Sequence, residues 1–169
     1  MSASSSATVP FVGLRAFDAA DAAWFFGRDR ETAALTLKLR ASRFTAVVGP
    51  SGSGKSSVVR AGVVPLLQSD GWRQIIVTPG NAPLARLARA LASAEADDRL
   101  AEARRFRFDA MLRASAFGLA EIAETLRADA PRLLLVVDQF EELFRYGDEA
   151  SGTMRVAMRE EGLSRPLLN

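Results

Sequence analysis

The sequence predicts an α/β fold in which helices cover both faces of a parallel sheet, and three observations support this. An octet at residues 49–56 fits the spacing G-x-x-x-x-G-K-[ST] of a phosphate-binding loop, directly after a β-favouring run. Residues 133–137 form an unbroken aliphatic run, which is typical of a parallel strand buried on both faces. The segments between these runs have the apolar spacing of helices. Together they predict a three-layer α/β/α arrangement.

Apolar spacing places the elements in order along the chain. A turn or a helix start is expected at residues 18–21, and the aromatic run 24–26 is expected to pack against the domain. Four helices are expected, over residues 30–41, from the loop to Pro65, over 84–94 and over 111–126. We expect Pro65 to end or kink the second of them. Strands are expected over residues 44–48, 72–78 and 132–137.

Composition limits the chemistry that this chain can perform. The 169 residues include no cysteine and no histidine, so disulfides, thiolate chemistry and a histidine base are excluded. The formal net charge is only +2, which gives little support for nucleic-acid binding. No apolar run approaches the ~20 residues of a membrane span, and residues 1–9 lack the features of a secretory signal. We expect residues 1–9 to be a disordered tail and the protein to be cytoplasmic, without a membrane partner.

One short segment, at residues 104–108, alternates arginine with phenylalanine. Such a pattern can grip phosphates and stack on bases, which is one interpretation. The other is a solvated helix face on which Phe106 points inward beside Glu102 and Asp109. We favour the second interpretation because the run is short and the net charge is low.

The loop is the main candidate site. Its glycines let successive backbone N–H groups surround a phosphate, and the following helix adds the positive end of its dipole. Lys55 is expected to reach the β- and γ-phosphates, and the Ser56 hydroxyl to bind Mg²⁺. The alternative is a glycine-rich turn with an exposed lysine, but the strand-loop-helix context and the presence of only two lysines count against it. The expected nucleotide-binding residues are Gly49, Pro50, Ser51, Gly52, Ser53, Gly54, Lys55, Ser56 and Ser57.

A second motif follows the aliphatic run. Asp138 ends that strand, where its carboxylate can hold Mg²⁺ at the carboxyl edge of the sheet. Glu141 and Glu142 begin the next segment, and either of them could position the attacking water or simply complement a helix dipole. The expected catalytic residues are therefore Glu141, Glu142 and Lys55, and the metal ligands are Ser56 and Asp138. Lysine occurs only at positions 38 and 55, which excludes the Asn-Lys-x-Asp guanine motif and favours ATP.

Several further stretches resemble one family, the bacterial STAND proteins, which are signal-transduction ATPases related to AAA+ and NACHT proteins. The likeness covers roughly residues 10–147 and is greatest to the branch often fused to WD repeats. The matching stretches are Pro10-Phe11 with Gly13-Leu14 and Phe17, Phe25 to Arg28, Val48 to Ser57, Arg60-Ala61-Gly62 with Pro65, Trp72-Arg73 with Pro79-Gly80, and Val137 to Phe144.

The resemblance implies a P-loop NTPase fold and an ATP-driven switch, in which the nucleotide state controls oligomerisation and an attached effector. It also places Phe26, Gly27 and Arg28 near the adenine. Asp29 stands where relatives commonly have glutamate.

The end of the chain departs from the family pattern. Relatives insert a sensor strand between the loop strand and the Asp138 strand, and a helical lid follows. After Phe144 this sequence has no strand-like aliphatic run, although residues 154–160 could form a helix. We therefore expect residues 10–169 to be a partial domain without the sensor strand and lid: a truncated chain, a gene fragment, or a protein completed by another chain.

The leading hypothesis is an Mg-ATP-binding signalling switch module with slow ATP hydrolysis. One alternative is a nucleotide-binding interaction module without turnover, and another is a nucleic-acid-dependent ATPase. The expected partners are ATP or ADP, a second copy of the chain, or C-terminal domains of the same protein. The sequence does not define the signal, the effector or the oligomeric state.

Overall fold

The computed structural model describes residues 13, 15–93, 98–127 and 132–146. The chain divides into two compact units, Met1–Trp72 and Arg73–Asn169. The tail expected at residues 1–9 and the helix considered at 154–160 lie outside the described residues.

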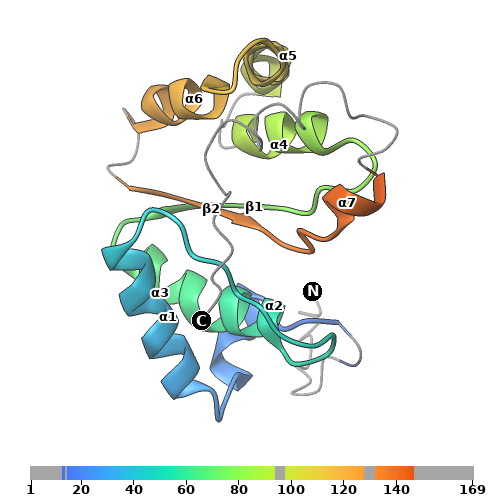
Figure 1. Cartoon of the computed structure of the whole chain (residues 1–169). Helices are drawn as coiled ribbons and strands as arrows, with labels where there is room; N and C mark the ends of the chain where they lie inside the picture. The colour runs from blue at the N-terminus through green and yellow to red at the C-terminus, as the bar shows by residue number, and fades with distance from the viewer. Residues whose placement is uncertain (1–12, 14, 94–97, 128–131, 147–169) are drawn as a thin grey trace, which may run out of the picture. The chain divides into compact units, whose positions relative to one another are not determined.

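The first unit is built from helical segments (Figure 1). A long helical run follows the loop, with a six-residue π-helix in its middle. The 3₁₀-helix η1 and the helix α1 both pack against this π-helix. The elements are η1 (Ala19–Trp24), α1 (Asp29–Ala41), α2 (Lys55–Ser57), the π-helix η2 (Val58–Val63) and α3 (Val64–Ser69).

Local sequence explains where these helices begin and end. Asp18 caps η1, because its side chain accepts a hydrogen bond from the Ala20 N–H while the Asp21 side chain accepts one from the Asp18 N–H. Of the two alternatives expected at residues 18–21, a turn and a helix start, the structure has the helix start. Helix α1 has acidic residues in its first turn and basic residues in its last, as the helix dipole favours. Arg40, near its end, forms an ion pair with Asp70, which follows α3.

The helical run after the loop does not end at Pro65. It continues to Ser69, and Pro65 lies in the first turn of α3, directly after the π-helix. A proline there has no N–H to donate, and the change from π to α hydrogen bonding falls just before it. Gly62 in the π-helix allows α1 to approach closely, since a Cβ at this position would lie 2.5 Å from Thr32 Oγ1 on α1.

The aromatic run 24–26 packs only in part. Phe25 lies near Gly62 and has its ring centroid 5.8 Å from that of Phe17. Trp24 and Phe26 are 40% and 76% exposed, so the prediction that they pack against the domain was wrong. The 3₁₀-helix ends at Trp24, and Phe25 is the member that lies against the π-helix.

The strand expected at residues 44–48 does not form. These residues have no regular secondary structure and pair with no strand of the described chain, and Phe44 and Val48 are 83% and 88% exposed. A strand exists only through ladder hydrogen bonds with a neighbour, however strong the β propensity of its side chains. This prediction was therefore wrong for the structure as described.

The second unit contains a two-stranded parallel sheet, β1 (Arg73–Val77) and β2 (Leu133–Val137). The strands pair in register from Arg73 opposite Leu133 to Val77 opposite Val137, so both of these predicted strands are confirmed. Helices α4, α5 and α6 lie together on one side of the sheet in Figure 1. The helices of this unit are α4 (Pro83–Ala92), α5 (Asp98–Ala114), α6 (Gly118–Arg127) and α7 (Glu142–Tyr146).

A hydrophobic core joins β1 to the three helices α4, α5 and α6. Its buried members are Ile75, Ala88, Leu91, Ala92, Phe108, Leu112, Ile122 and Leu126. Strand β2 is less enclosed than its sequence predicts: Leu134 is buried and the other four residues are only half-buried. A sheet of two strands gives each strand fewer neighbours than a wide one, and the described chain is a helix-rich partial α/β fold.

The helix expected over residues 111–126 is divided between α5 and α6 in the structure. Helix α5 continues to Ala114, and α6 begins only at Gly118. Between them Ser115 Oγ accepts a hydrogen bond from the Phe117 N–H, 3.0 Å away. A Cβ on Gly118 would lie 2.2 Å from the Met111 carbonyl oxygen, so this tight junction requires glycine.

Phe106 does not point inward as expected. It is 63% exposed, whereas Phe108 is 1% exposed and belongs to the core. The Arg105 guanidinium lies over the Phe106 ring, 4.6 Å from its centroid, and Arg105 also pairs with Glu102. The helix is solvated on this face, as predicted, but the wrong phenylalanine was assigned to the interior.

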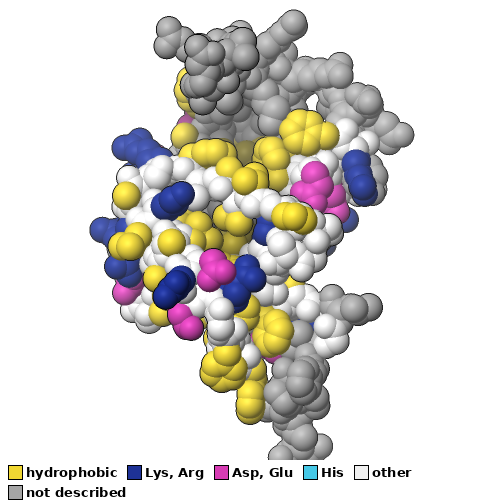
Figure 2. Space-filling model, turned by 60° about the horizontal axis from the view of Figure 1, so that its bottom comes forward, with side chains coloured by type: hydrophobic (Ala, Val, Ile, Leu, Met, Phe, Trp, Pro, Cys, Tyr) yellow, Lys and Arg dark blue, Asp and Glu magenta, His cyan; other side chains and the backbone are white. Residues whose placement is uncertain are grey.

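Exposed apolar side chains occur on the surface as well. Figure 2 shows them on the displayed face beside lysine or arginine and aspartate or glutamate side chains. None of the helices in the described part of the chain is long and apolar enough to cross a membrane.

Candidate functional site

The glycine-rich loop has the backbone that a phosphate cradle requires. Gly52 and Gly54 have φ angles of 75° and 81°, in the left-handed region that favours glycine, and no other atom lies within 4 Å of where their Cβ atoms would be. The Ser53 N–H donates to the Pro50 carbonyl at 3.3 Å, which closes the loop. Side chains at Gly52 and Gly54 would be strained, and they would occupy the space beside the backbone amides.

Lys55 begins the helical run and folds back over the loop. Its Nζ donates hydrogen bonds to the carbonyl oxygens of Gly49 and Pro50, at 2.9 Å each. Both acceptors are neutral, and both hydrogen bonds are exposed to solvent. A phosphate oxygen carries negative charge, so it adds a Coulombic attraction to the ammonium that a neutral carbonyl lacks. The ammonium group is therefore at the loop and can exchange these carbonyls for a phosphate.

Two contacts from the N-terminal part of the first unit hold this loop and its helix. The Arg28 guanidinium donates to the Ser53 carbonyl at 3.2 Å, and it also pairs with Glu31. The Ser57 Oγ accepts a hydrogen bond from the Phe17 N–H at 3.2 Å. Ser57 was expected only as a nucleotide ligand, and this second contact was not predicted.

Among the three residues assigned to the adenine side, the structure brings only Arg28 to the loop. Phe26 is 76% exposed, and Gly27 has a φ angle of 80° with no atom within 4 Å of its would-be Cβ. These positions form the turn between η1 and α1. Their contact with an adenine stays a prediction.

An ion pair stabilises the segment that carries Phe17. Arg15 donates to both carboxylate oxygens of Asp21, at 2.5 and 2.8 Å. This hydrogen bonding, helped by the Asp18 N–H, lowers the pKa of Asp21 to about 2 from its ordinary value of 3.8. The Asp18-x-x-Asp21 spacing of a capping box was a sequence signal for the role of Asp21 at the start of η1.

The acidic turn, residues 138–142, follows β2 in the second unit. The Asp138 N–H donates to the Val77 carbonyl at 2.9 Å, so strand pairing continues to the first residue of the turn. Asp138 Oδ1 accepts a hydrogen bond from the Gln139 N–H at 3.0 Å. Gln139 has a φ angle of 57°, which is uncommon for a residue other than glycine. Such outliers cluster at functional sites.

The two glutamates of this turn have different surroundings. Glu142 is half-buried, and its Oε2 accepts a hydrogen bond from the Gly80 N–H at 2.8 Å. Glu141 is exposed, and its side chain has no hydrogen-bond partner within the described part of the chain. Sequence patterns do not distinguish the two glutamates, whereas their surroundings in the structure do.

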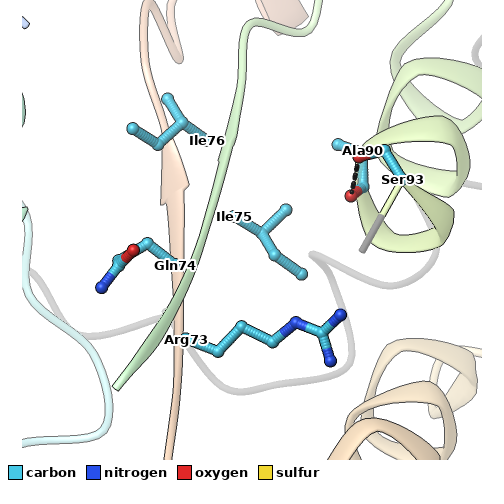
Figure 3. A pocket seen from close by; sticks show the side chains of 6 residues that line it. All are labelled: Arg73, Gln74, Ile75, Ile76, Ala90 and Ser93. Carbon is cyan, nitrogen blue, oxygen red and sulfur yellow. Dashed lines mark hydrogen bonds between the residues drawn. The ribbon is translucent and has the colours of Figure 1, made fainter. Parts of the chain in front are cut away.

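A hollow of about 340 Å³ lies beside β1 and α4, and none of the predicted site residues lines it. In Figure 3, Arg73 and Ile75 point to the side of β1 on which Ala90 of α4 and the following Ser93 lie, and Gln74 and Ile76 point to the other side. The Ser93 hydroxyl donates to the Ala90 carbonyl at 2.9 Å. The hollow contains none of the residues with the expected chemistry.

The loop belongs to the first unit, and the acidic turn belongs to the second. A family model described as Novel STAND NTPase 1 matches residues 10–159, a range that includes both motifs. Neither a curated protein nor a solved structure matches the chain. The match confirms the resemblance drawn from the motifs. The chain belongs to the Novel STAND NTPase 1 family.

Proposed function

We propose that the chain is a nucleotide-binding signalling module that binds Mg-ATP through the loop at residues 49–57 and hydrolyses it slowly. The observation that carries this proposal is the loop itself. Its two glycines in the left-handed region have open space where their Cβ atoms would be, and the Lys55 ammonium donates hydrogen bonds to its carbonyls. Membership of an NTPase family supports nucleotide and metal use in general.

In this proposal the loop amides and Lys55 bind the β- and γ-phosphates and offset their negative charge. Ser56 and Asp138 supply a hydroxyl and a carboxylate, the oxygen donors that Mg²⁺ prefers. The ion, when bound, neutralises charge on the phosphate oxygens. Arg28 fixes the loop through the Ser53 carbonyl, and a carboxylate of the acidic turn accepts the proton of the attacking water. Hydrolysis then resets the switch.

Nucleotide binding without turnover is a second candidate, and one observation favours it. The run at residues 44–48, which leads into the loop, has no strand partner among the described residues. Hydrolysis requires the reacting groups to be held more closely in place than binding does. A module of this kind would signal through the bound state alone.

The test is the affinity of a fluorescent ATP analogue, with Mg²⁺, for the parent chain and for Lys55→Ala. Loss of hydrogen bonds between a charged donor and phosphate should weaken binding at least about tenfold. Lys38→Ala is the matched control, because Lys38 is the other lysine of the chain and lies exposed on α1. Equal affinity of the parent and Lys55→Ala, or no binding by the folded parent, would contradict the proposal.

A further inference from the structure

One hydrogen bond in the second unit joins two loops that are 62 residues apart in sequence. Glu142 Oε2 accepts it from the Gly80 N–H, at 2.8 Å. The two loops leave the sheet at the same end, because Val77 and Val137, the last residues of β1 and β2, are paired. The side chain therefore ties the acidic turn to the loop that follows β1.

Gly80 is well placed to serve as a fixed donor. It has a φ angle of 57°, and a Cβ there would lie 2.7 Å from Arg86 Cζ on α4. The Arg86 guanidinium therefore lies beside the Gly80 backbone, and the carboxylate of Glu142 binds the Gly80 N–H. Helix α4 is itself anchored in the core of this unit through Ala88, Leu91 and Ala92.

The turn that receives this tie is short and strained. Gln139 has a positive φ angle, and its carbonyl accepts a hydrogen bond from the Glu142 N–H at 2.9 Å. Glu142 therefore closes the turn with its backbone and fixes it to Gly80 with its side chain. Strained backbone persists only where its surroundings hold it in place. Asp138, at the start of the same turn, pairs with Val77 through its backbone, and these contacts hold the residues that follow it.

We propose that Glu142 is a positioning residue whose carboxylate, bound to the Gly80 N–H, fixes the turn that carries Asp138, and that Glu141 is the carboxylate that acts on water. This inference rests on the proposed function and assigns different roles to its two glutamates. Glu142 needs only an acceptor oxygen for its task. Glu141, which is exposed, needs a group that can take a proton.

This difference gives the two residues opposite responses to the same substitution. Glutamine keeps the length of glutamate and one carbonyl acceptor, but it is not a base. Glu142→Gln should keep the tie to Gly80, whereas Glu142→Ala should break it. Glu141→Gln should be as inactive in turnover as Glu141→Ala.

The first measurement is hydrogen exchange of the Gly80 amide in the whole chain, by NMR. In Glu142→Ala we expect exchange about ten- to a hundredfold faster, as for loss of a hydrogen bond to a charged acceptor. Glu142→Gln, Glu141→Ala and Glu141→Gln should leave it near the parent rate. An unchanged exchange rate in Glu142→Ala would show that the Glu142 carboxylate does not hold the Gly80 N–H, and the proposal would be wrong.

The second measurement is the gain in affinity for a fluorescent ATP analogue on adding Mg²⁺, followed by turnover. Glu142→Ala should lose the gain, Glu142→Gln should keep both the gain and turnover, and Glu141→Gln should keep the gain but lose turnover. If Glu142→Gln behaved like Glu142→Ala with Gly80 still protected, Glu142 would be a catalytic residue and the proposal would be wrong. If the parent bound no nucleotide, the proposed function would fail and the positioning role with it, although the exchange rate of Gly80 would still report the tie.

Discussion

The loop and the acidic turn are held in place by different kinds of contact. The turn follows a paired strand, its first N–H continues the pairing to Val77, and Glu142 ties it to Gly80. The loop follows a run, residues 44–48, that has no strand partner among the described residues. It is held instead from its C-terminal side, by the helix that packs on α1 and by two contacts at Ser53 and Ser57.

This difference teaches that a motif specifies which residues meet a ligand, whereas the neighbouring elements specify how firmly they are held. The acidic turn is held in place by the two-stranded sheet and the hydrophobic core of the second unit. The loop is held by the packing of its helix on α1 and by contacts from the segment at residues 15–28. Different substitutions should therefore displace the loop and the acidic turn.

The largest expected effect concerns the core beneath the sheet of the second unit. Phe108→Ala should lower the free energy of unfolding by about 3–5 kcal/mol, because Phe108 is 1% exposed and its removal leaves a cavity. Phe106→Ala, two residues away and 63% exposed, is the matched control and should change it by less than about 0.5 kcal/mol. Urea unfolding measures both. Similar costs for the two variants would contradict the core as described.

A smaller effect is expected where the helix after the loop meets α1. Gly62→Ala should cost about 1–3 kcal/mol, because the new Cβ would lie 2.5 Å from Thr32 Oγ1. Thr32→Ala removes that atom, so the double variant should lose less stability than the two single variants added together. Urea unfolding of all four proteins completes the cycle. Simple additivity would show that this contact does not hold the loop helix.

The smallest effect concerns the segment that contacts Ser57. Because the Arg15 hydrogen bonds depress the pKa of Asp21 to about 2, the stability that Asp21 contributes is present above its ordinary value of 3.8. It is lost as the pH falls through the folded value, between about pH 4 and pH 2. In Asp21→Asn the midpoint of thermal unfolding, measured by circular dichroism, should depend less on pH in this window than it does in the parent. Glu124→Gln, which alters an exposed ion pair on α6, should leave the profile unchanged.

Sequence reasoning succeeded where the cause is local. The unbroken aliphatic run gave the strand at residues 133–137, Asp18 marked the start of η1, and glycines occur where the loop needs positive φ angles. Each of these follows from side chains within a few residues of the feature.

The remaining features depend on partners far away in the chain. Residues 44–48 have strand propensity, but pairing needs a neighbour that no local pattern supplies. Phe106 and Phe108 are two positions apart on one helix, and only the packing of α4 and α6 decides which is buried. The hydrogen bond from Gly80 to Glu142 spans 62 residues, and nothing in either segment predicts it.

The most direct test of the account is whether the loop and the acidic turn serve the same nucleotide. We would measure the affinity of a fluorescent ATP analogue, with and without Mg²⁺, for the parent, Lys55→Ala and Asp138→Asn. The account predicts that Lys55→Ala weakens binding under both conditions, whereas Asp138→Asn keeps the metal-free affinity and loses the gain from Mg²⁺. An Asp138→Asn variant that gained as much from Mg²⁺ as the parent would contradict it.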